Sequence, residues 1–475
     1  MEGSEMSGHR THIYPHGNVL YRKLGHEFPL IVRGEGSYLI DQDGRRYLDG
    51  SGGALVVNAG HGNREIAAAI GAQAGALAYV SGMQFTHAPV EALAGELCGI
   101  APAGLTKAFF LSSGAEVVDA AIKLARLYWI ARGKPEKSLI ISRVPSYHGN
   151  TLGAMGVSGR LSYRAMFDPL VVDHPKIPPP LCYRCPWGKT FPQCDYECAA
   201  ELEIAVQKAG PGKVAAFLAE PILGTTGAAM VPPPDYYPRI RSTCRKYEVL
   251  FVADEILCGM GRTGEWWGID GYGVAPDVLL AGKGMTSGYI PLSALLVGEE
   301  IINVLRDAGK EFPHAQTFAH HPVACAAGLA TLRFIQKHDL VARCREMGLT
   351  LHHELERLRE HPLVGDIRGK GLLAGIELVA DRSLRQPFPR EYKLAETIAA
   401  GALSRGLVVW PNVGHVDGLK GDAILLAPPF IIEREEIMRM VSILGEALEE
   451  AVATVDRRAE GVSAGERPDG GPVGR

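Results

Sequence analysis

Two charged residues stand where short apolar runs of the sequence end, and together they could act on one ligand. Asp254 follows the run at residues 249–253, and Lys283 comes just after the run at residues 278–281. Such runs are typical of strands buried on both faces of a parallel sheet. A buried strand does not tolerate a charge, whereas the crevice beyond its carboxyl end does, and open α/β sheets bind ligands there. We therefore expect the acid and the lysine in one crevice.

This pair of side chains suits pyridoxal phosphate. A lysine amine can form a Schiff base with the cofactor's aldehyde, and a carboxylate can hold its protonated ring nitrogen. Each residue also has an ordinary interpretation. Asp254-Glu255 could be a helix cap or a solvated turn, and Gly282-Lys283-Gly284 could be only a turn. The cofactor hypothesis therefore needs further parts of a site.

A phosphate site is predicted at Ser113-Gly114-Ala115. These residues join an expected strand at residues 107–111 to an expected helix at residues 115–131. Unpaired backbone N–H groups at a helix start, with the helix dipole behind them, bind phosphate. Ser113 and Glu116 also form a capping box, which needs no ligand, and both interpretations can hold together.

An aromatic residue is expected in the same crevice. Tyr147 follows the expected strand at residues 139–142, and His148 is next to it. The ring of Tyr147 could lie against a planar cofactor, although an aromatic residue at a strand end can also be ordinary core or rim.

A competing motif is present at residues 259–264. Gly259-Met260-Gly261-Arg262-Thr263-Gly264 has the glycine spacing of a dinucleotide-binding fingerprint and follows a strand. A true fingerprint opens a helix, but Glu265-Trp266-Trp267-Gly268 do not begin one. We interpret the match as accidental, which makes a dinucleotide-dependent oxidoreductase the weakest of the functions considered.

The composition excludes several classes of protein. The chain has 475 residues, of which 47% are hydrophobic and 21% charged, and its net charge of −4 does not favour nucleic-acid binding. No apolar run approaches the ~18–20 residues of a membrane-spanning helix, and residues 1–10 lack the apolar core of a signal peptide. Nine cysteines without such a signal favour a reducing compartment, so we expect a cytoplasmic protein.

The order of elements predicts an α/β fold. Strands that alternate with helices indicate a mostly parallel, doubly wound sheet. The expected strands lie at residues 107–111, 139–142, 214–219, 249–253, 278–281 and 294–297.

Four segments are expected along the chain. Residues 1–59 form an N-terminal arm and a hairpin that turns at Asp43-Gly44, and residues 60–330 form the large domain. Residues 331–454 form a smaller α+β domain, and the tail at residues 455–475, which has few apolar residues, is expected to be disordered.

Taken together, these motifs resemble those of a known family. The chain is similar to class III (ω-type) aminotransferases, which are pyridoxal-phosphate enzymes of fold type I, from about Gly36 to Glu449. The resemblance is carried, in this order, by Ser112-Ser113-Gly114-Ala115-Glu116, Tyr147-His148-Gly149, Glu220-Pro221, Asp254-Glu255-Ile256 with Gly259-Met260-Gly261-Arg262-Thr263-Gly264, Gly282-Lys283-Gly284 and Thr317-Phe318.

The resemblance implies roles for two catalytic residues and a phosphate site. Lys283 would hold the cofactor as a Schiff base and, once released by substrate, move a proton between the substrate carbon and the cofactor. Asp254 would keep the pyridine nitrogen protonated, so that the ring withdraws electrons. Ser113, Gly114 and Ala115 would bind the phosphate.

It also implies further cofactor-binding residues. Tyr147 would stack on one ring face and Ile256 would pack on the other, while Glu255 would support the ring hydroxyl region or neighbouring side chains. Thr317 would reach the phosphate bound by a second subunit, which implies a homodimer with the site at its interface. His148 and Glu220 complete the expected set.

The implied reaction moves an amino group from a primary amine or ω-amino acid to a 2-oxo acid such as pyruvate or 2-oxoglutarate. A decarboxylating or amino-shifting enzyme on the same scaffold is the alternative, and a non-catalytic binding protein is a more distant one.

Two departures from the family pattern leave the identity of the substrate open. Asn150 stands where many relatives carry an arginine, and residues 411–421 contain no arginine and only Lys420. Arg160 or Arg164 could bind a substrate carboxylate instead, or the donor is a neutral amine.

Four cysteines are concentrated in one short segment. Cys182, Cys185, Cys194 and Cys198 have a spacing that could hold a structural zinc ion. The two pairs lie closer together than in common zinc folds, and the alternative is a proline-rich surface loop with reduced or packed thiols. We favour that alternative and predict no metal.

Overall fold

The computed structural model describes residues 17–465, except for the side chains of Tyr163 and of residues 456–465. Residues 1–16 of the expected N-terminal arm lie outside this description. The expected hairpin forms from β2 (Tyr38–Asp41) and β3 (Arg46–Asp49), which pair antiparallel.

The predicted α/β fold is confirmed, and its main sheet has seven strands. The order is β4-β10-β9-β8-β7-β5-β6, and all neighbouring pairs are parallel except those of β10, which is antiparallel to β4 and to β9. The strands are β4 (Leu105–Leu111), β5 (Leu139–Arg143), β6 (Lys176–Ile177), β7 (Val214–Ala219), β8 (Leu250–Asp254), β9 (Val278–Ala281) and β10 (Ser293–Gly298).

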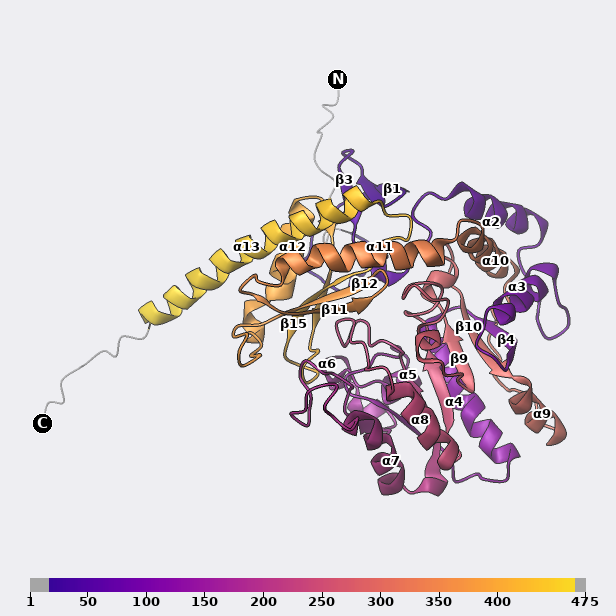
Figure 1. The fold of residues 1–475 in the computed structure, drawn as a ribbon. Helices are drawn as coiled ribbons and strands as arrows, with labels where there is room; N and C mark the ends of the chain where they lie inside the picture. Colours follow the sequence, from indigo (N-terminus) through magenta and orange to yellow (C-terminus); the bar gives the residue numbers. More distant parts are fainter. Residues whose placement is uncertain (1–16, 466–475) are drawn as a thin grey trace, which may run out of the picture.

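Helices cover both faces of this sheet (Figure 1). One face packs against α4 (Gly114–Ala131), α5 (Leu152–Val157) and α9 (Glu299–Asp307), and the other against α3 (Ala88–Gly99), α7 (Glu197–Ala209) and α8 (Tyr236–Lys246). Because both faces are covered, the central strands are wholly buried, as the unbroken apolar runs predict.

Two four-stranded sheets complete the described chain. One has the order β1-β2-β3-β13 and the other the order β11-β12-β15-β14. Their remaining strands are β1 (Ile31–Glu35), β11 (Val364–Lys370), β12 (Leu373–Leu378), β13 (Leu407–Val408), β14 (Trp410–Val413) and β15 (Asp422–Leu426).

The remaining helices and short turns connect these sheets. The helices are α1 (Gly52–Leu55), α2 (Arg64–Ala76), α6 (Leu161–Arg164), α10 (Pro322–Lys337), α11 (Leu340–Leu355), α12 (Leu394–Ser404) and α13 (Arg434–Gly465). The last helix, α13, runs to Gly465, beyond the last core residue, Ala451, and so overlaps the start of the segment predicted as a tail. Residues 466–475 of the expected tail lie outside the described residues.

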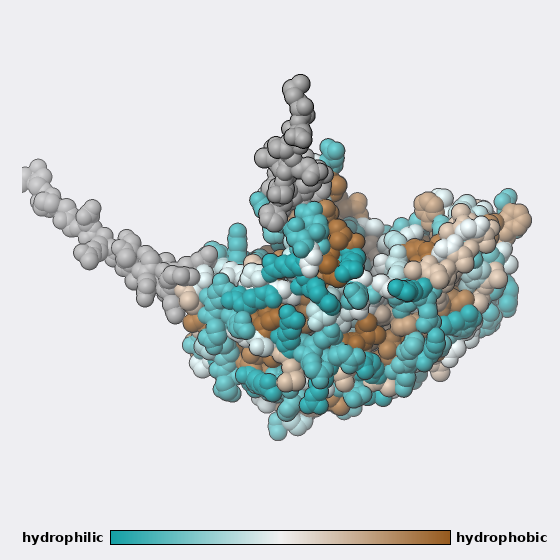
Figure 2. Space-filling view, turned by 90° about the horizontal axis from the view of Figure 1, so that it is seen from above, coloured by the Kyte–Doolittle hydropathy of each residue, from teal (hydrophilic) through white to brown (hydrophobic). Residues whose placement is uncertain are grey.

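The surface is mainly hydrophilic on the face seen from above, where hydrophobic residues form only small separate patches (Figure 2). Within residues 17–465, no helix is both long and apolar enough to cross a lipid bilayer.

Candidate functional site

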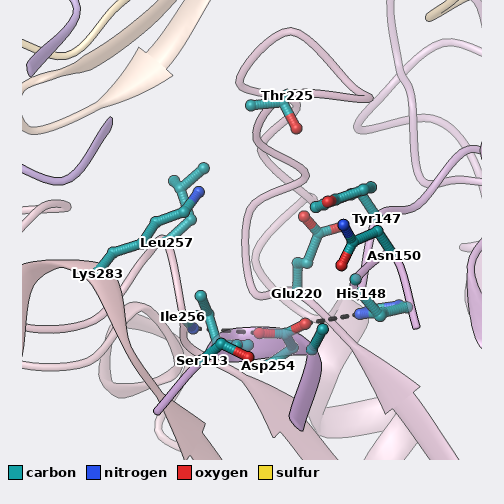
Figure 3. Close-up of a pocket in the computed structure, with 13 residues that line it drawn as sticks. Ser113, Tyr147, His148, Asn150, Glu220, Thr225, Asp254, Ile256, Leu257 and Lys283 are labelled. Atoms are coloured by element: carbon teal, nitrogen blue, oxygen red, sulfur yellow. Dashed lines mark hydrogen bonds and ion pairs between the residues drawn. The ribbon is translucent and has the colours of Figure 1, made fainter. Parts of the chain in front are cut away.

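A cavity of about 220 Å³ opens where several strands of the seven-stranded sheet end (Figure 3). Its walls come from the turns that follow β4, β5, β7, β8 and β9, so five segments far apart in sequence meet there. It is lined by Ser113, Gly114, Ala115, Tyr147, His148, Gly149, Asn150, Glu220, Thr225, Asp254, Ile256, Leu257 and Lys283. Most of these residues were expected in one crevice, and the fold brings them to one cavity.

Asp254 is the last residue of β8 and is held firmly at the base of the cavity. It is 2% exposed, and its Oδ2 lies 2.7 Å from Nδ1 of His148. The backbone N–H of Ile256 donates to its Oδ1 at 3.1 Å. His148 was expected in the crevice only because it follows Tyr147. The structure shows its role, which is to orient the buried carboxylate of Asp254.

Lys283 lies across the cavity from Tyr147 and Glu220 (Figure 3). It begins the short turn η4 (Lys283–Met285) after β9, and its φ of 42° is unusual for a residue with a side chain. The pKa of its amine is lowered, chiefly by burial, although the charges of Asp254 and Glu220 act in the opposite direction. A lowered pKa keeps more of the amine neutral, which is the form that reacts as a nucleophile or a base.

The start of α4 is arranged to receive an anion. Both halves of the predicted capping box form, since the Ser113 side chain accepts from the N–H of Glu116 and the Glu116 side chain accepts from the N–H of Ser113. The N–H groups of Gly114 and Ala115 have no acceptor within the helix and lie at its positive end. The capping and anion-binding interpretations are therefore compatible in this structure.

Ile256 forms part of the cavity floor between two glycines. A Cβ atom added to either Gly114 or Gly282 would come within 3.2 Å of the Ile256 side chain. Glycine at both positions therefore leaves Ile256 room to present its side chain to the cavity.

Glu220 brings a second carboxylate into the cavity. It follows β7, is 4% exposed, and its Oε2 has no hydrogen-bond partner among the described residues. Burial, followed by the nearby charge of Asp254, raises the pKa of its carboxyl group to about 7, against the opposing effect of His148.

Two of the predicted cofactor-binding residues do not line this cavity. Glu255 points away from it, because both of its carboxylate oxygens accept backbone N–H groups at 2.8 Å, those of Gly268 and Ile269. The predicted role of Glu255 near the ring hydroxyl region or neighbouring side chains stays a prediction, and in this structure its carboxylate holds the turn at Gly268 and Ile269. Thr317 is exposed outside the cavity, where its carbonyl accepts from the hydroxyl of Tyr79 at 2.9 Å.

The dinucleotide-like segment at residues 259–264 forms turns and no helix, as the sequence analysis argued. Arg262 is fully buried and donates to the carbonyls of Leu372 and Pro428 and to the side chain of Asn58. The segment that contains these glycines therefore has a structural role, since its arginine joins parts of the chain that are far apart in sequence.

Comparison with known proteins identifies the family. The sequence model of the family described as "Aminotransferase class-III" matches residues 21–448. The chain belongs to the class III aminotransferases.

Relatives of known sequence and structure agree with this assignment. The chain is 37% identical over 427 residues to a Bacillus subtilis protein named "uncharacterized aminotransferase YodT", covering 90% of this chain and 96% of the relative. It is 34% identical to the putrescine–pyruvate aminotransferase of Pseudomonas aeruginosa, covering 90% and 91%. Among solved structures, an (S)-enantioselective ω-transaminase from Thermomicrobium roseum superposes with a TM-score of 0.84 at 37% identity, covering 90% and 93%.

Four residues of this aminotransferase cavity were not predicted as site residues, and two of them, Gly149 and Asn150, directly follow the predicted Tyr147-His148. Thr225 lies on the Gly224-Thr225-Thr226-Gly227 turn beyond β7, and Leu257 directly follows Ile256. The paired glycines after an apolar strand were the only signal for Thr225, and the position next to Ile256 was the signal for Leu257.

The cavity of this aminotransferase has no arginine among its lining residues in the described chain. Arg164 is paired with Asp168 and Asp173 at 2.6 and 2.7 Å, and neither it nor Arg160 lines the cavity. Asn150 is in the lining and presents a neutral amide. Within one chain, therefore, the cavity has no guanidinium that could hold a substrate carboxylate.

Proposed function

We propose that this aminotransferase moves an amino group from a primary amine or ω-amino acid to a 2-oxo acid, pyruvate or 2-oxoglutarate, with pyridoxal phosphate as cofactor. The observation that carries the proposal is the meeting of Lys283, the Asp254–His148 pair and the start of α4 in one cavity.

The residues fit the cofactor by their chemistry. The N–H groups of Gly114 and Ala115, together with Ser113, suit a phosphate, and the buried carboxylate of Asp254 suits a protonated ring nitrogen. The side chain of Ile256 and the ring of Tyr147 offer apolar surfaces to a flat aromatic ring. When bound, the cofactor supplies the electron sink that makes loss of a proton from the amine-bearing carbon accessible at neutral pH.

Three side chains of the cavity have different roles in the proposed reaction. Lys283 would take the proton of the amine-bearing carbon at its neutral Nζ and pass it on within the same half of the reaction, which its lowered pKa favours. His148 holds Asp254 in a fixed orientation through the contact at 2.7 Å. Glu220 adds a carboxylate that stabilises nearby positive charge while it is ionised.

We also propose that the working form is a homodimer in the cytoplasm. Thr317 and Phe318 are exposed and lie outside their own cavity, so they are available to a second subunit. In that arrangement Thr317 would contact the phosphate bound by the partner. All nine cysteines are unpaired, which suits a reducing compartment.

A panel of primary amines, diamines and ω-amino acids, each tested with pyruvate and with 2-oxoglutarate, examines the proposal. We expect alanine or glutamate to form in proportion to the amine consumed. Turnover without an acceptor, or release of carbon dioxide, would instead favour the amino-shifting or decarboxylating alternative. The absence of any amino transfer across the panel would contradict the proposal.

A further inference from the structure

The segment that connects β6 to α7 is long and has little structure of its own. It covers residues 178–196 without a helix or strand. Two backbone hydrogen bonds join residues of this segment to one another, from Leu181 to Pro179 and from Gly188 to Cys185. Ordered loops of this length are uncommon unless something else holds them together.

Three cysteines of this segment and one at the start of α7 surround one small cavity. Cys182, Cys185, Cys194 and Cys198 all line it, and none of them forms a disulfide. The fold thus brings to one place four thiols that the sequence separates into two pairs.

The local backbone brings the cysteines of each pair together. Cys182 and Cys185 lie on either side of a turn at residues 183–184. A second turn follows, in which the N–H of Gly188, whose φ of 65° favours glycine, donates to the Cys185 carbonyl at 3.0 Å. Cys194 precedes α7, and Cys198 lies in its first turn. Two ligands on a turn and two around a helix start, with two and three residues between the members of each pair, match the arrangement of structural zinc sites.

We propose that Cys182, Cys185, Cys194 and Cys198 bind one structural zinc ion. This reverses the preference drawn from the sequence, because the fold places both pairs around the same cavity. Among the described residues, no group of three or more cysteine, histidine or acidic side chains already surrounds a common metal position. Binding therefore draws the four sulfur atoms inward by side-chain rotation.

The proposed binding step balances in charge. Each of the four thiols releases a proton to solvent, and four Zn–S bonds form, which leaves the centre with a net charge of −2. Lys189 lines the same cavity, where its Nζ lies 3.8 Å from Oε1 of Glu197, and its charge can offset part of this negative charge.

The zinc ion would stabilise contacts that the loop makes with the active site. Leu181 packs with Leu223 and Met230, and Tyr183 packs against the same cluster. Leu223 and Met230 pair across the turn that carries Thr225. The cysteine loop therefore supports a wall of the aminotransferase cavity from behind.

The same loop is tied to the sheet formed by β11, β12, β15 and β14. Arg184 donates to the buried carboxylate of Glu377 on β12 and to the carbonyl of Arg385. Arg385 in turn donates to the carbonyl of Tyr183. A fixed position of Cys182 and Cys185 therefore also fixes the arginine between them.

The test is the metal content of the full-length chain. The chain, produced without a polyhistidine tag and with zinc in the growth medium, is analysed by elemental mass spectrometry. We expect one zinc per chain, with most of it lost in the Cys185→Ser and Cys194→Ser variants. Cys98→Ser is the matched control, because Cys98 is a partly buried thiol in α3 outside the cluster, and it should retain full zinc.

A second measurement covers the case in which the variants fail to fold. Treatment of the unaltered chain with a mercurial reagent should release one zinc ion, detected with a chromogenic chelator, and the zinc-depleted chain should have a lower melting temperature that added zinc restores. The proposal is overturned if the unaltered chain carries no zinc, whether its thiols are free or form disulfides. It is also overturned if the two cluster variants keep their zinc, or if Cys98→Ser loses as much as they do.

Discussion

The aminotransferase cavity is built from two kinds of structure, the ends of strands and the loops beyond them. Ser113, Asp254 and Lys283 stand at or just beyond the ends of β4, β8 and β9, and we refer to them as the strand-end residues. Asn150 and Thr225 stand on loops, and we refer to them as the loop residues. Asp254 is opposite Leu280 in the parallel pairing of β8 and β9, so the core itself sets its distance from the turn that carries Lys283.

The difference indicates a division of labour. A strand end surrounded by packed core can hold a charged group in one geometry, which a shared cofactor requires. A loop can change its sequence without disturbing the core, which suits the recognition of different substrates. We therefore expect substitutions of strand-end residues to reduce catalysis with every substrate, and substitutions of loop residues to change the ranking of substrates.

The largest effect is expected for Lys283→Ala. Since this amine is proposed both to bind the cofactor and to move the proton, we expect kcat/KM to fall by about 10³-fold or more for every amine. Reduction of the cofactor-loaded enzyme with borohydride, followed by peptide mapping, should also label Lys283 in the unaltered chain. Lys310→Ala, which removes an exposed lysine, is the control and should remain fully active. An active Lys283→Ala enzyme would remove the distinction between the two groups of residues.

A smaller but still large loss is expected for Asp254→Asn. The substitution keeps the shape and removes the charge, so kcat/KM should fall by about 10²-fold while the fold is retained. The neighbouring Glu255→Gln is the matched control, because Glu255 points away from the cavity and holds the backbone at Gly268 and Ile269. Glu255→Gln should lower the melting temperature and leave cofactor affinity unchanged. Equal losses of cofactor affinity in both variants would contradict the assignment.

Glu220→Gln should change the pKa of the Lys283 amine, and it should lower kcat/KM less than Asp254→Asn does. The negative charge of Glu220 raises the pKa of Lys283. Glu220 has a pKa of about 7, so it carries this charge at alkaline pH. Removal of the charge therefore lowers the pKa of Lys283, and more of the amine is neutral at a given alkaline pH. Competitive acetylation of the cofactor-free chain, read by mass spectrometry, measures this pKa directly. An unchanged or higher pKa in the variant would show that Glu220 does not act on Lys283.

The smallest effect is expected for Thr225→Val, which replaces a hydroxyl with a methyl group of similar size. Thr225 lies above the cavity in Figure 3, opposite the base formed by Asp254. We expect KM to change by about 10-fold or less, and differently for amines with polar and apolar side chains, at a nearly constant kcat. A uniform fall of kcat for all amines would instead place Thr225 with the strand-end residues.

The same contrast explains what could be predicted from the sequence. Asp254 and Lys283 were predictable because an unbroken apolar run followed by a polar residue marks the end of a buried strand, and Ser113 because it joins an expected strand to an expected helix. The contact between His148 and Asp254 was not, because it joins the ends of two strands that are separated by β7 in the sheet. The resemblance to the family gave Glu255 its predicted place, and the sequence could not show that its carboxylate accepts the N–H groups of Gly268 and Ile269.

Long-range packing also accounts for the other departures. The antiparallel direction of β10 could not be predicted from its sequence, because a strand covered on both faces is apolar in either direction. The spacing of the four cysteines suggested a metal site, but only the fold shows that both pairs reach one cavity.

A crystal structure of the full chain with pyridoxal phosphate tests the central claim most directly. The account predicts the cofactor's aldehyde end at Nζ of Lys283, its ring nitrogen within hydrogen-bond distance of Asp254, and its phosphate at the N–H groups of Gly114 and Ala115. A cofactor bound in another cavity, or one whose ring nitrogen lies away from Asp254, would contradict it.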